Sequence, residues 1–224
     1  LIASIILLPS GVGKMRSKPK FSQVFSNRPA INRLSAARFF LFASRDVWFV
    51  VGLPVFLYEV LGWSFTGVGS FLALWIIGYG AIQASAPDLL KARAGEHATG
   101  GGTARRLVML LAICPAAIAL ALHQAWDPTL VLISGLVLFG IVFAFNSSVH
   151  SYLILAYADH DKVSMNVGFY YMANAGGRLF GTVLSGLSYQ QFGLEGCLWC
   201  SALLVVIAAL LSIGLPEIRH SAAT

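Results

Sequence analysis

Apolar runs long enough to cross a membrane divide this sequence, and they limit its possible folds more than any other feature. Residues 129–156 and 196–215 contain no Asp, Glu, Lys or Arg. A helix needs about 20 apolar residues to cross the hydrocarbon core of a bilayer. With 58% hydrophobic and 11% charged residues, the chain is also too apolar for a soluble or a disordered protein. The sequence therefore predicts an all-α transmembrane protein.

Six spans are predicted, and proline marks the irregular points in several of them. Pro54 is expected to kink the first span, and Pro87 is expected to end the second, because proline cannot donate a backbone hydrogen bond. The predicted spans are residues 34–61, 66–86, 106–122, 129–156, 163–189 and 196–215, and together they form a six-helix bundle over residues 34–224.

The first 33 residues differ from the rest of the chain. Residues 1–9 are apolar but too short to span, so we interpret them as the remnant of a preceding transmembrane helix. Residues 10–33 contain six Lys and Arg and no acidic residue, which is typical of a basic cytoplasmic loop. Apolar residues within 21–25 predict a short helix at the membrane surface. The chain is thus expected to be a fragment that begins near the end of an earlier helix.

The charged residues between spans alternate from one side of the predicted bundle to the other. Loops near residues 61–65, 123–128 and 190–195 contain no Lys or Arg, whereas the opposite loops contain several. Lys and Arg are enriched in cytoplasmic loops, so the basic stretch and the C-terminus are placed in the cytoplasm. The net charge of +6 is explained by this topology and not by nucleic-acid binding. We expect a multi-pass protein of the cell inner (plasma) membrane.

Two arginines and one aspartate lie deep inside predicted spans, away from the ends of the helices. Arg45 and Asp46 are about ten residues into the first span, and Arg178 is near the middle of the fifth. A charge at the bilayer centre costs about 2.5–3.5 kcal/mol on insertion scales. Either these residues form an internal ion pair, such as Arg178 with Asp46, or the arginines bind an anionic substrate through their planar forks. Arg38 is expected to snorkel to the cytoplasmic surface or, less simply, to mark a site entrance.

Further polar residues complete the candidate site. Asn146 and His150 share one face of the fourth span, and either line a cavity or hydrogen-bond to a neighbouring helix. In the fifth span, Asn174 lies on the face of Arg178, and Tyr171 is a further candidate for substrate binding. Asp46 is the candidate for proton coupling, and His150 is a second candidate because imidazole titrates near neutral pH. No catalytic residue, metal site or cofactor is predicted.

Glycines in the fifth span predict close helix packing. Gly177 and Gly181 form a small-xxx-small pattern, which lets two helices approach closely in a membrane. In contrast, Cys197 and Cys200 resemble a redox motif only in their spacing, because the βαβ context of such motifs is missing. We interpret these two cysteines as small apolar residues on a packed helix.

The residues favour a transporter over other membrane proteins. An intramembrane serine protease would need a Gly-x-Ser-Gly nucleophile motif, and the nearest stretch, residues 183–186, lacks its first glycine. A structural membrane subunit gives no reason for arginines at depth. An arginine-containing cavity and helices interrupted by proline and glycine fit a transporter. We therefore expect a transporter and not an enzyme.

The order of elements resembles the C-terminal half of a major facilitator superfamily protein, with a basic central loop followed by six spans. Residues 80–93 occupy the place of the loop motif of that superfamily, although the motif is degenerate here. This resemblance implies a twelve-helix fold, of which the chain would supply six helices. An N-terminal half of the transporter would then complete the substrate site.

Long segments resemble, more narrowly, the organoarsenical efflux permease family ArsJ. This resemblance implies export of 1-arseno-3-phosphoglycerate, an anionic compound that a partner glyceraldehyde-3-phosphate dehydrogenase makes from arsenate, and hence arsenate resistance. Arg45 and Arg178 would bind its two oxyanions. The alternative is a general facilitator-type exporter of another organic anion or drug. The matching segments are INRLSAARFFLF (31–42), SRDVWFVVGLPVFLYEVLGWS (44–64), FLALWIIGYGAIQASAP (71–87), NSSVHSYLILAYA (146–158) and VGFYYMANAGGRLFGTVLSGLSYQ (167–190).

Overall fold

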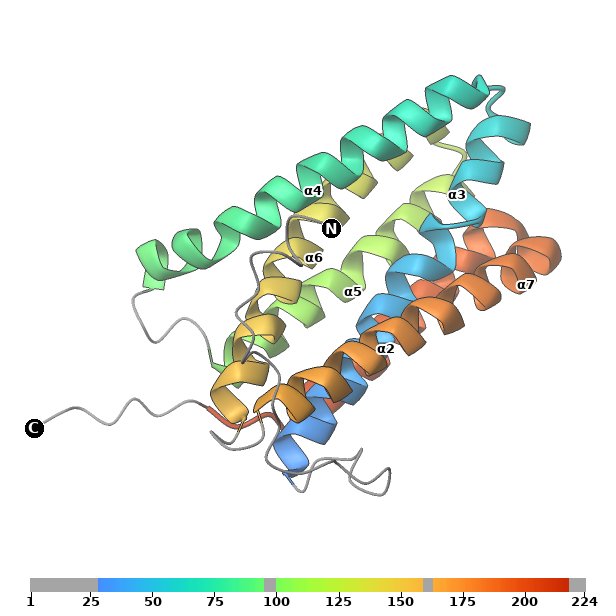
Figure 1. The fold of residues 1–224 in the computed structure, drawn as a ribbon. Helices are drawn as coiled ribbons and strands as arrows, with labels where there is room; N and C mark the ends of the chain where they lie inside the picture. The colour runs from blue at the N-terminus through green and yellow to red at the C-terminus, as the bar shows by residue number, and fades with distance from the viewer. Residues whose placement is uncertain (1–27, 95–99, 159–162, 218–224) are drawn as a thin grey trace, which may run out of the picture.

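The chain folds as a bundle of long helices in a computed structural model, which describes residues 28–94, 100–158 and 163–217 (Figure 1). Five helical segments in these ranges are long and apolar enough to cross a membrane. The prediction of an all-α membrane protein is therefore confirmed. The remnant at residues 1–9, the surface helix at 21–25 and most of the basic loop lie outside the described residues. The elements are α2 (Pro29–Phe49), α3 (Gly52–Val55), η2 (Phe56–Val60), α4 (Phe65–Ala94), α5 (Gly101–His123), α6 (Pro128–Tyr157) and α7 (Val163–Ser212).

The first span begins earlier than predicted and is broken where a kink was expected. Helix α2 starts at Pro29, because proline fits the first helical turn, where its missing N–H has no partner to lose. This start assigns residues 29–33 to the helix and not to the basic loop. The helix ends at Phe49, and after a short break α3 and the single π-turn η2 continue the span to Val60. The break lies just before Gly52 and Pro54, so the predicted irregularity is confirmed.

The second span, by contrast, does not end at Pro87 as predicted. Pro87 lies inside α4, which runs on to Ala94. Proline removes one backbone hydrogen bond, but helices of membrane proteins tolerate this loss more often than soluble ones do. The predicted end at residue 86 was therefore wrong, since it treated proline as a terminator.

Helix α7 turns back on itself at Gly193. This residue has φ 64° and ψ −161°, a left-handed φ that glycine adopts without a steric penalty. Across the turn, the Cys197 Sγ lies 3.6 Å from the carbonyl oxygen of Ser185, so the two arms of α7 contact each other. In Figure 1 the orange arm and the red arm accordingly run side by side. Residues 163–192 and 194–212 are the two arms, and they correspond to the fifth and sixth predicted spans.

Helix α2 packs tightly against the first arm of α7 through two glycines. A Cβ atom at Gly177 would collide with the carbonyl oxygen of Phe39, and one at Gly181 would lie 2.5 Å from the carbonyl oxygen of Ala43. Any side chain at these positions would push the helices apart. The close approach predicted from the Gly177–Gly181 spacing is thus confirmed. The two helices run parallel at this contact. Gly177 meets Phe39, and Gly181, four residues later, meets Ala43, which is also four residues later.

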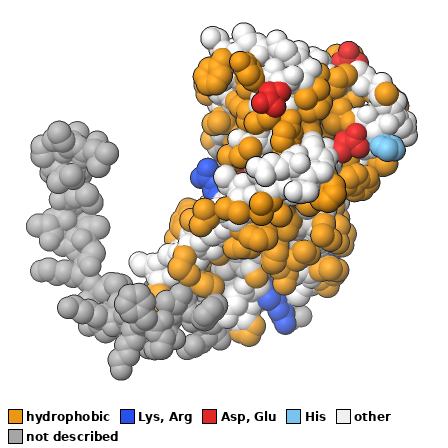
Figure 2. All heavy atoms as spheres, turned by 90° about the vertical axis from the view of Figure 1, so that its right-hand side faces the viewer, with side chains coloured by type: hydrophobic (Ala, Val, Ile, Leu, Met, Phe, Trp, Pro, Cys, Tyr) orange, Lys and Arg blue, Asp and Glu red, His pale blue; other side chains and the backbone are white. Residues whose placement is uncertain are grey.

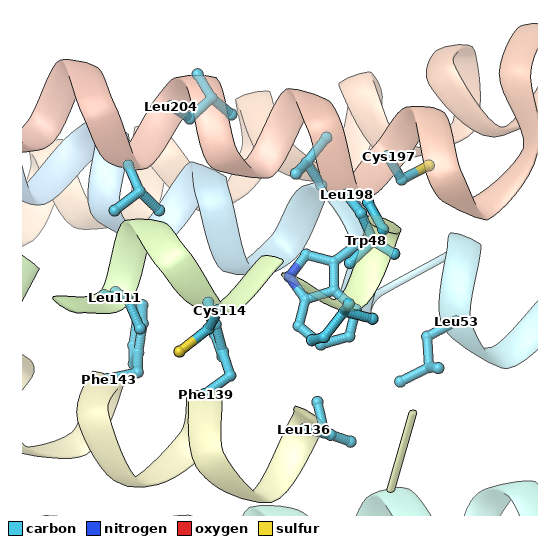
Figure 3. Close-up of a cluster of buried hydrophobic side chains, with 14 of the residues drawn as sticks. Trp48, Leu53, Leu111, Cys114, Leu136, Phe139, Phe143, Cys197, Leu198 and Leu204 are labelled. Atoms are coloured by element: carbon cyan, nitrogen blue, oxygen red, sulfur yellow. The ribbon is translucent and has the colours of Figure 1, made fainter. Parts of the chain in front are cut away.

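A hydrophobic core joins α2, α5, α6 and α7. Trp48 of α2 packs edge-on against Phe139 of α6, with ring centroids 5.3 Å apart, and Figure 3 shows Leu198 beside Trp48 and Cys114 beside Phe139. Helix α4 joins this core through several side chains, among them Trp75, whose Nε1 donates a hydrogen bond of 2.9 Å to the carbonyl oxygen of Leu136. Over residues 65–90, most of the other side chains of α4 are exposed, and many of them are apolar. Figure 2 shows hydrophobic side chains over much of one face, as expected for a bundle that is surrounded by lipid.

The two ends of the bundle differ in charge, as the alternating loops predicted. At one end, Arg28 donates to the carbonyl oxygen of Tyr157 and Arg33 to that of Gly214. At the other end, His123 Nδ1 lies 3.4 Å from a carboxylate oxygen of Glu195. The acidic side chains and histidine visible in Figure 2, which faces this second end, lie among hydrophobic ones. The cytoplasmic assignment of the basic end stays a prediction.

Candidate functional site

Two arginines share one buried carboxylate between α2 and α7. The Nε of Arg45 donates to Asp46 Oδ1 at 2.6 Å, and the Nε of Arg178 donates to Asp46 Oδ2 at 3.2 Å. Asp46 is only 1% exposed, whereas the side chains of Arg45 and Arg178 are 12% and 58% exposed. We call these three residues the Asp46 cluster. The ion pair that the sequence offered as one alternative is therefore present.

The Asp46 cluster retains an excess of positive charge. One carboxylate faces two guanidinium groups, so one positive charge has no counterpart within the cluster. The exposed Arg178 fork is accessible from outside the protein. An anion that approached it would meet two cations that a single carboxylate holds in position, and a preorganised arginine fork binds phosphate or carboxylate oxygens in pairs.

Helix packing positions this cluster. Arg178 follows Gly177 directly, and the contact of Gly177 with Phe39 brings α7 close enough to α2 for Arg178 to reach Asp46. The two residues are 132 positions apart in the sequence. The cluster therefore depends on the glycine contact between the two helices.

Arg38 differs from the prediction made for it. Its side chain is buried, with 3% exposure, and does not snorkel to the surface. Its Nη1 donates to the hydroxyl and to the carbonyl oxygen of Ser147 on α6, at 3.0 and 3.2 Å. The ion pairs among the described residues do not include Arg38. The snorkelling prediction was wrong because the helix places this residue toward α6 and not toward the end of the bundle.

An aromatic ring joins the surroundings of Arg38 and Arg45. The guanidinium carbon of Arg38 lies 4.1 Å from the ring centroid of Phe42, and that of Arg45 lies 4.9 Å from it. The two carbons are therefore no farther apart than the sum of these distances, about 9 Å. Aromatic faces attract cations, so the ring partly compensates for two positive charges held near each other.

The predicted polar residues of α6 lie beside Arg38. Asn146 and His150 are completely buried and flank Ser147, the partner of Arg38. Neither the amide of Asn146 nor the two ring nitrogens of His150 have a hydrogen-bond partner in the described part of the chain. The expectation of a shared face is met, but the helix–helix hydrogen bonds that were the alternative are not formed by these atoms.

On α7 the structure brings a different tyrosine to the site. The predicted Tyr171 is 55% exposed, whereas Tyr170 is completely buried. The Tyr170 ring centroid lies 5.0 Å from the guanidinium carbon of Arg38, and its hydroxyl interacts with Ser151 of α6. Asn174, four residues later on the same helical face, has an unpartnered Oδ1.

Sequence reasoning missed Tyr170 and gave Arg38 only as the less simple alternative, a residue at a site entrance. The signal for Arg38 was its position seven residues, or about two turns, before Arg45 on nearly the same face. One signal distinguishes Tyr170 from Tyr171: Tyr170 lies seven residues before Gly177, on the face of α7 that packs against α2. Tyr171 is rotated by about 100° from that face.

The fold and the site define an integral membrane protein in which charged and polar groups from three helices, α2, α6 and α7, meet between membrane-length segments. Such an arrangement is typical of transporters. The sequence model of the Major Facilitator Superfamily matches residues 34–223, and the chain belongs to that superfamily. It is thus a membrane transporter of a small-molecule substrate. A comparison with curated proteins found no match.

Proposed function

We propose that this chain is the six-helix C-terminal half of a twelve-helix exporter whose cargo is an anionic organoarsenical, 1-arseno-3-phosphoglycerate. A partner glyceraldehyde-3-phosphate dehydrogenase would form this compound from arsenate. Its export across the inner membrane would confer arsenate resistance. The N-terminal half would complete the substrate site, and α4, which contacts the rest of the described bundle mainly through α6, offers it an apolar face.

The main support for this proposal is that guanidinium groups outnumber the carboxylates paired with them. Arg38, Arg45 and Arg178 lie near one another, and Asp46 is the one carboxylate paired with them among the described residues. Unpaired charge within a membrane is costly, and a bound anion offsets it. The proposed cargo has a phosphate ester and an arsenate ester, both of which suit arginine forks.

The resemblance to the ArsJ family supports the choice of this anion. The quoted similar segments include Arg38, Arg45 and Asp46 on α2 and the polar residues of α6 and α7 that surround them. Pentavalent arsenic in an ester does not seek thiols. The three cysteines, which are all free, therefore have no required role in binding.

Asp46 has the central position in the proposed transport cycle. As a carboxylate it holds Arg45 and Arg178 together, so both forks are oriented before the substrate arrives. A proton on Asp46 would remove its charge and weaken both ion pairs. We propose that this coupling links proton binding to a change in how tightly the two arginines hold the anion.

Arsenate resistance tests the proposal directly. The full reading frame that encodes this chain is expressed in an arsenate-sensitive bacterium together with the dehydrogenase. We expect Arg45→Gln and Arg178→Gln to lower arsenical efflux at least about tenfold, because each removes a charge-assisted bidentate contact. Arg→Lys at either position keeps the charge but loses the fork, and should give intermediate efflux.

The matched control is Arg106→Gln, which removes an exposed arginine near the start of α5 and should leave efflux unchanged. Membrane levels of all variants are compared by immunoblot. Normal resistance in both the Arg45 and the Arg178 variants would refute the role of these residues. A wild-type protein that gives no arsenate resistance would instead favour the general exporter of another organic anion.

A further inference from the structure

A second group of polar side chains lies next to the Asp46 cluster but is not part of it. Arg38 of α2, Asn146 and His150 of α6 and Tyr170 of α7 form this group, which we call the Arg38 cluster. Each is at least nine-tenths buried. Arg38 contacts the ring of Tyr170 and bonds to Ser147, which lies between Asn146 and His150 in sequence, and it interacts electrostatically with His150.

The Arg38 cluster is unusual because so many of its buried polar atoms have no partner. A buried polar group without a hydrogen bond destabilises a protein, so such atoms are rare in native structures. Side chains that serve only to join helices would satisfy one another. This cluster does not, and its free atoms in the described part of the chain are Arg38 Nε, Asn146 Nδ2 and Oδ1, and His150 Nδ1 and Nε2, whereas the Tyr170 hydroxyl interacts with Ser151.

The chemistry of these atoms fits an oxyanion. Guanidinium, amide, imidazole and phenol groups all offer N–H or O–H donors, and the cluster contains no carboxylate to compete for them. A guanidinium within such a group makes a phosphate or carboxylate the best complement. The Asn146 oxygen can in turn accept a bond from a substrate hydroxyl.

We propose that the Arg38 cluster is a second anion subsite, which binds one end of a short organic dianion whose other end is bound by Arg45 and Arg178. This inference rests on the proposed anion-binding role of those two arginines. Because both guanidinium carbons contact the Phe42 ring, at 4.1 and 4.9 Å from its centroid, they lie within about 9 Å of each other. A backbone of a few carbons with an oxyanion at each end fits within this distance.

Binding of two commercial probes to the purified full-length protein in detergent tests this subsite. The first probe, 3-phosphoglycerate, has a phosphate and a carboxylate at opposite ends; the second, glycerol 3-phosphate, has only the phosphate. We expect calorimetry to show that the wild type binds the first about tenfold more tightly, the effect of one additional charge-assisted contact. Arg38→Gln should abolish this preference, and Arg106→Gln should keep it.

The Asn146→Leu variant tests whether Asn146 binds a ligand or only joins two helices. It also provides a second test if an Arg38 variant does not fold. Leucine has a similar size and removes unpartnered polar atoms, so the apparent melting temperature without ligand should be unchanged or higher. The preference for 3-phosphoglycerate should nevertheless fall. A lower melting temperature with an intact preference would mean that Asn146 joins helices, and it would overturn the proposal.

The remaining outcomes distinguish this subsite from the proposed function. A wild type without the preference, or an Arg38→Gln variant that keeps it, would refute the second subsite even if Arg45→Gln abolished arsenate resistance. Conversely, the absence of arsenate resistance would reject the arsenical cargo. The preference for the dianion and its loss in Arg38→Gln would still establish the subsite.

Discussion

The Asp46 cluster and the Arg38 cluster both include arginines of α2, and both contact the Phe42 ring. They differ in whether an acidic side chain pairs with the arginines. In the first, a buried carboxylate pairs with two arginines, one of which is largely exposed. In the second, a buried arginine contacts only neutral groups, and most of the polar atoms around it have no partner in the described structure. The first cluster is therefore largely satisfied by its own residues, and the second is not.

The difference teaches that this chain keeps capacity for an anion in two ways. In the Asp46 cluster, ion pairs hold α2 and α7 in register and leave one positive charge without a counterpart. Unsatisfied donors lower stability and keep that capacity available, a trade that functional sites commonly make. The following substitutions change the carboxylate, the helix contact or the aromatic ring on which the difference between the clusters depends. They are given from the largest expected effect to the smallest.

Asp46→Asn would remove the only carboxylate of the first cluster and make it resemble the second. Two guanidinium groups would then lie together without a counter-charge, so the free energy of unfolding should fall by about 3 kcal/mol, as for a broken buried ion pair. Denaturation of the purified protein in detergent measures this loss. Glu59→Gln, which removes an exposed carboxylate, is the matched control and should have little effect. An unchanged stability in Asp46→Asn would show that the ion pairs contribute nothing.

Gly177→Ala would separate α7 from α2 and so affect the two clusters unequally. The new Cβ would collide with the Phe39 backbone, and we expect a loss of about 2 kcal/mol, within the range for overpacking. Arg178 should move away from Asp46, while the contact of Arg38 with Ser147 on α6 should persist. Gly186→Ala provides the control, because nothing lies within 4 Å of that position. If both alanine variants melted at the same temperature, the close approach would be refuted.

Phe42→Leu would remove the ring that contacts both clusters while keeping an apolar side chain. Two cation–π contacts would be lost, and the expected decrease in stability is about 1 kcal/mol. Because the ring contacts both Arg38 and Arg45, the preference for 3-phosphoglycerate over glycerol 3-phosphate should decrease as well. A preference equal to that of the wild type would show that the ring does not position these arginines.

Much of the fold could be predicted because hydropathy is a local property. The span over residues 129–156 lies within α6, and the irregular point near Pro54 coincides with the break between α2 and α3. The predictions failed where one residue type is compatible with two different structures. Pro87 ends many soluble helices but is tolerated within α4, and Arg38 has a stem long enough to snorkel but is turned inward.

The site was predicted less completely than the fold. Arg45, Asp46 and Arg178 were recognised because charge at depth is rare in membrane spans. Asn146 and His150 were recognised by their spacing, and both are buried beside Arg38. Tyr171 was selected where Tyr170 is the residue in contact with Arg38. The spacing of Tyr170 from Gly177, seven residues on the face that packs against α2, was not used.

The sequence by itself thus determined that this protein is a helical membrane transporter, roughly where most of its spans lie and that α2 and α7 approach through Gly177 and Gly181. These properties follow from apolar length, loop charge and residue size, each of which can be read within one segment. Only the tertiary structure decided which charges are paired. Asp46 meets Arg178 from 132 positions away, and Arg38 is left among neutral groups, because such pairings depend on how whole helices are shifted and rotated against one another.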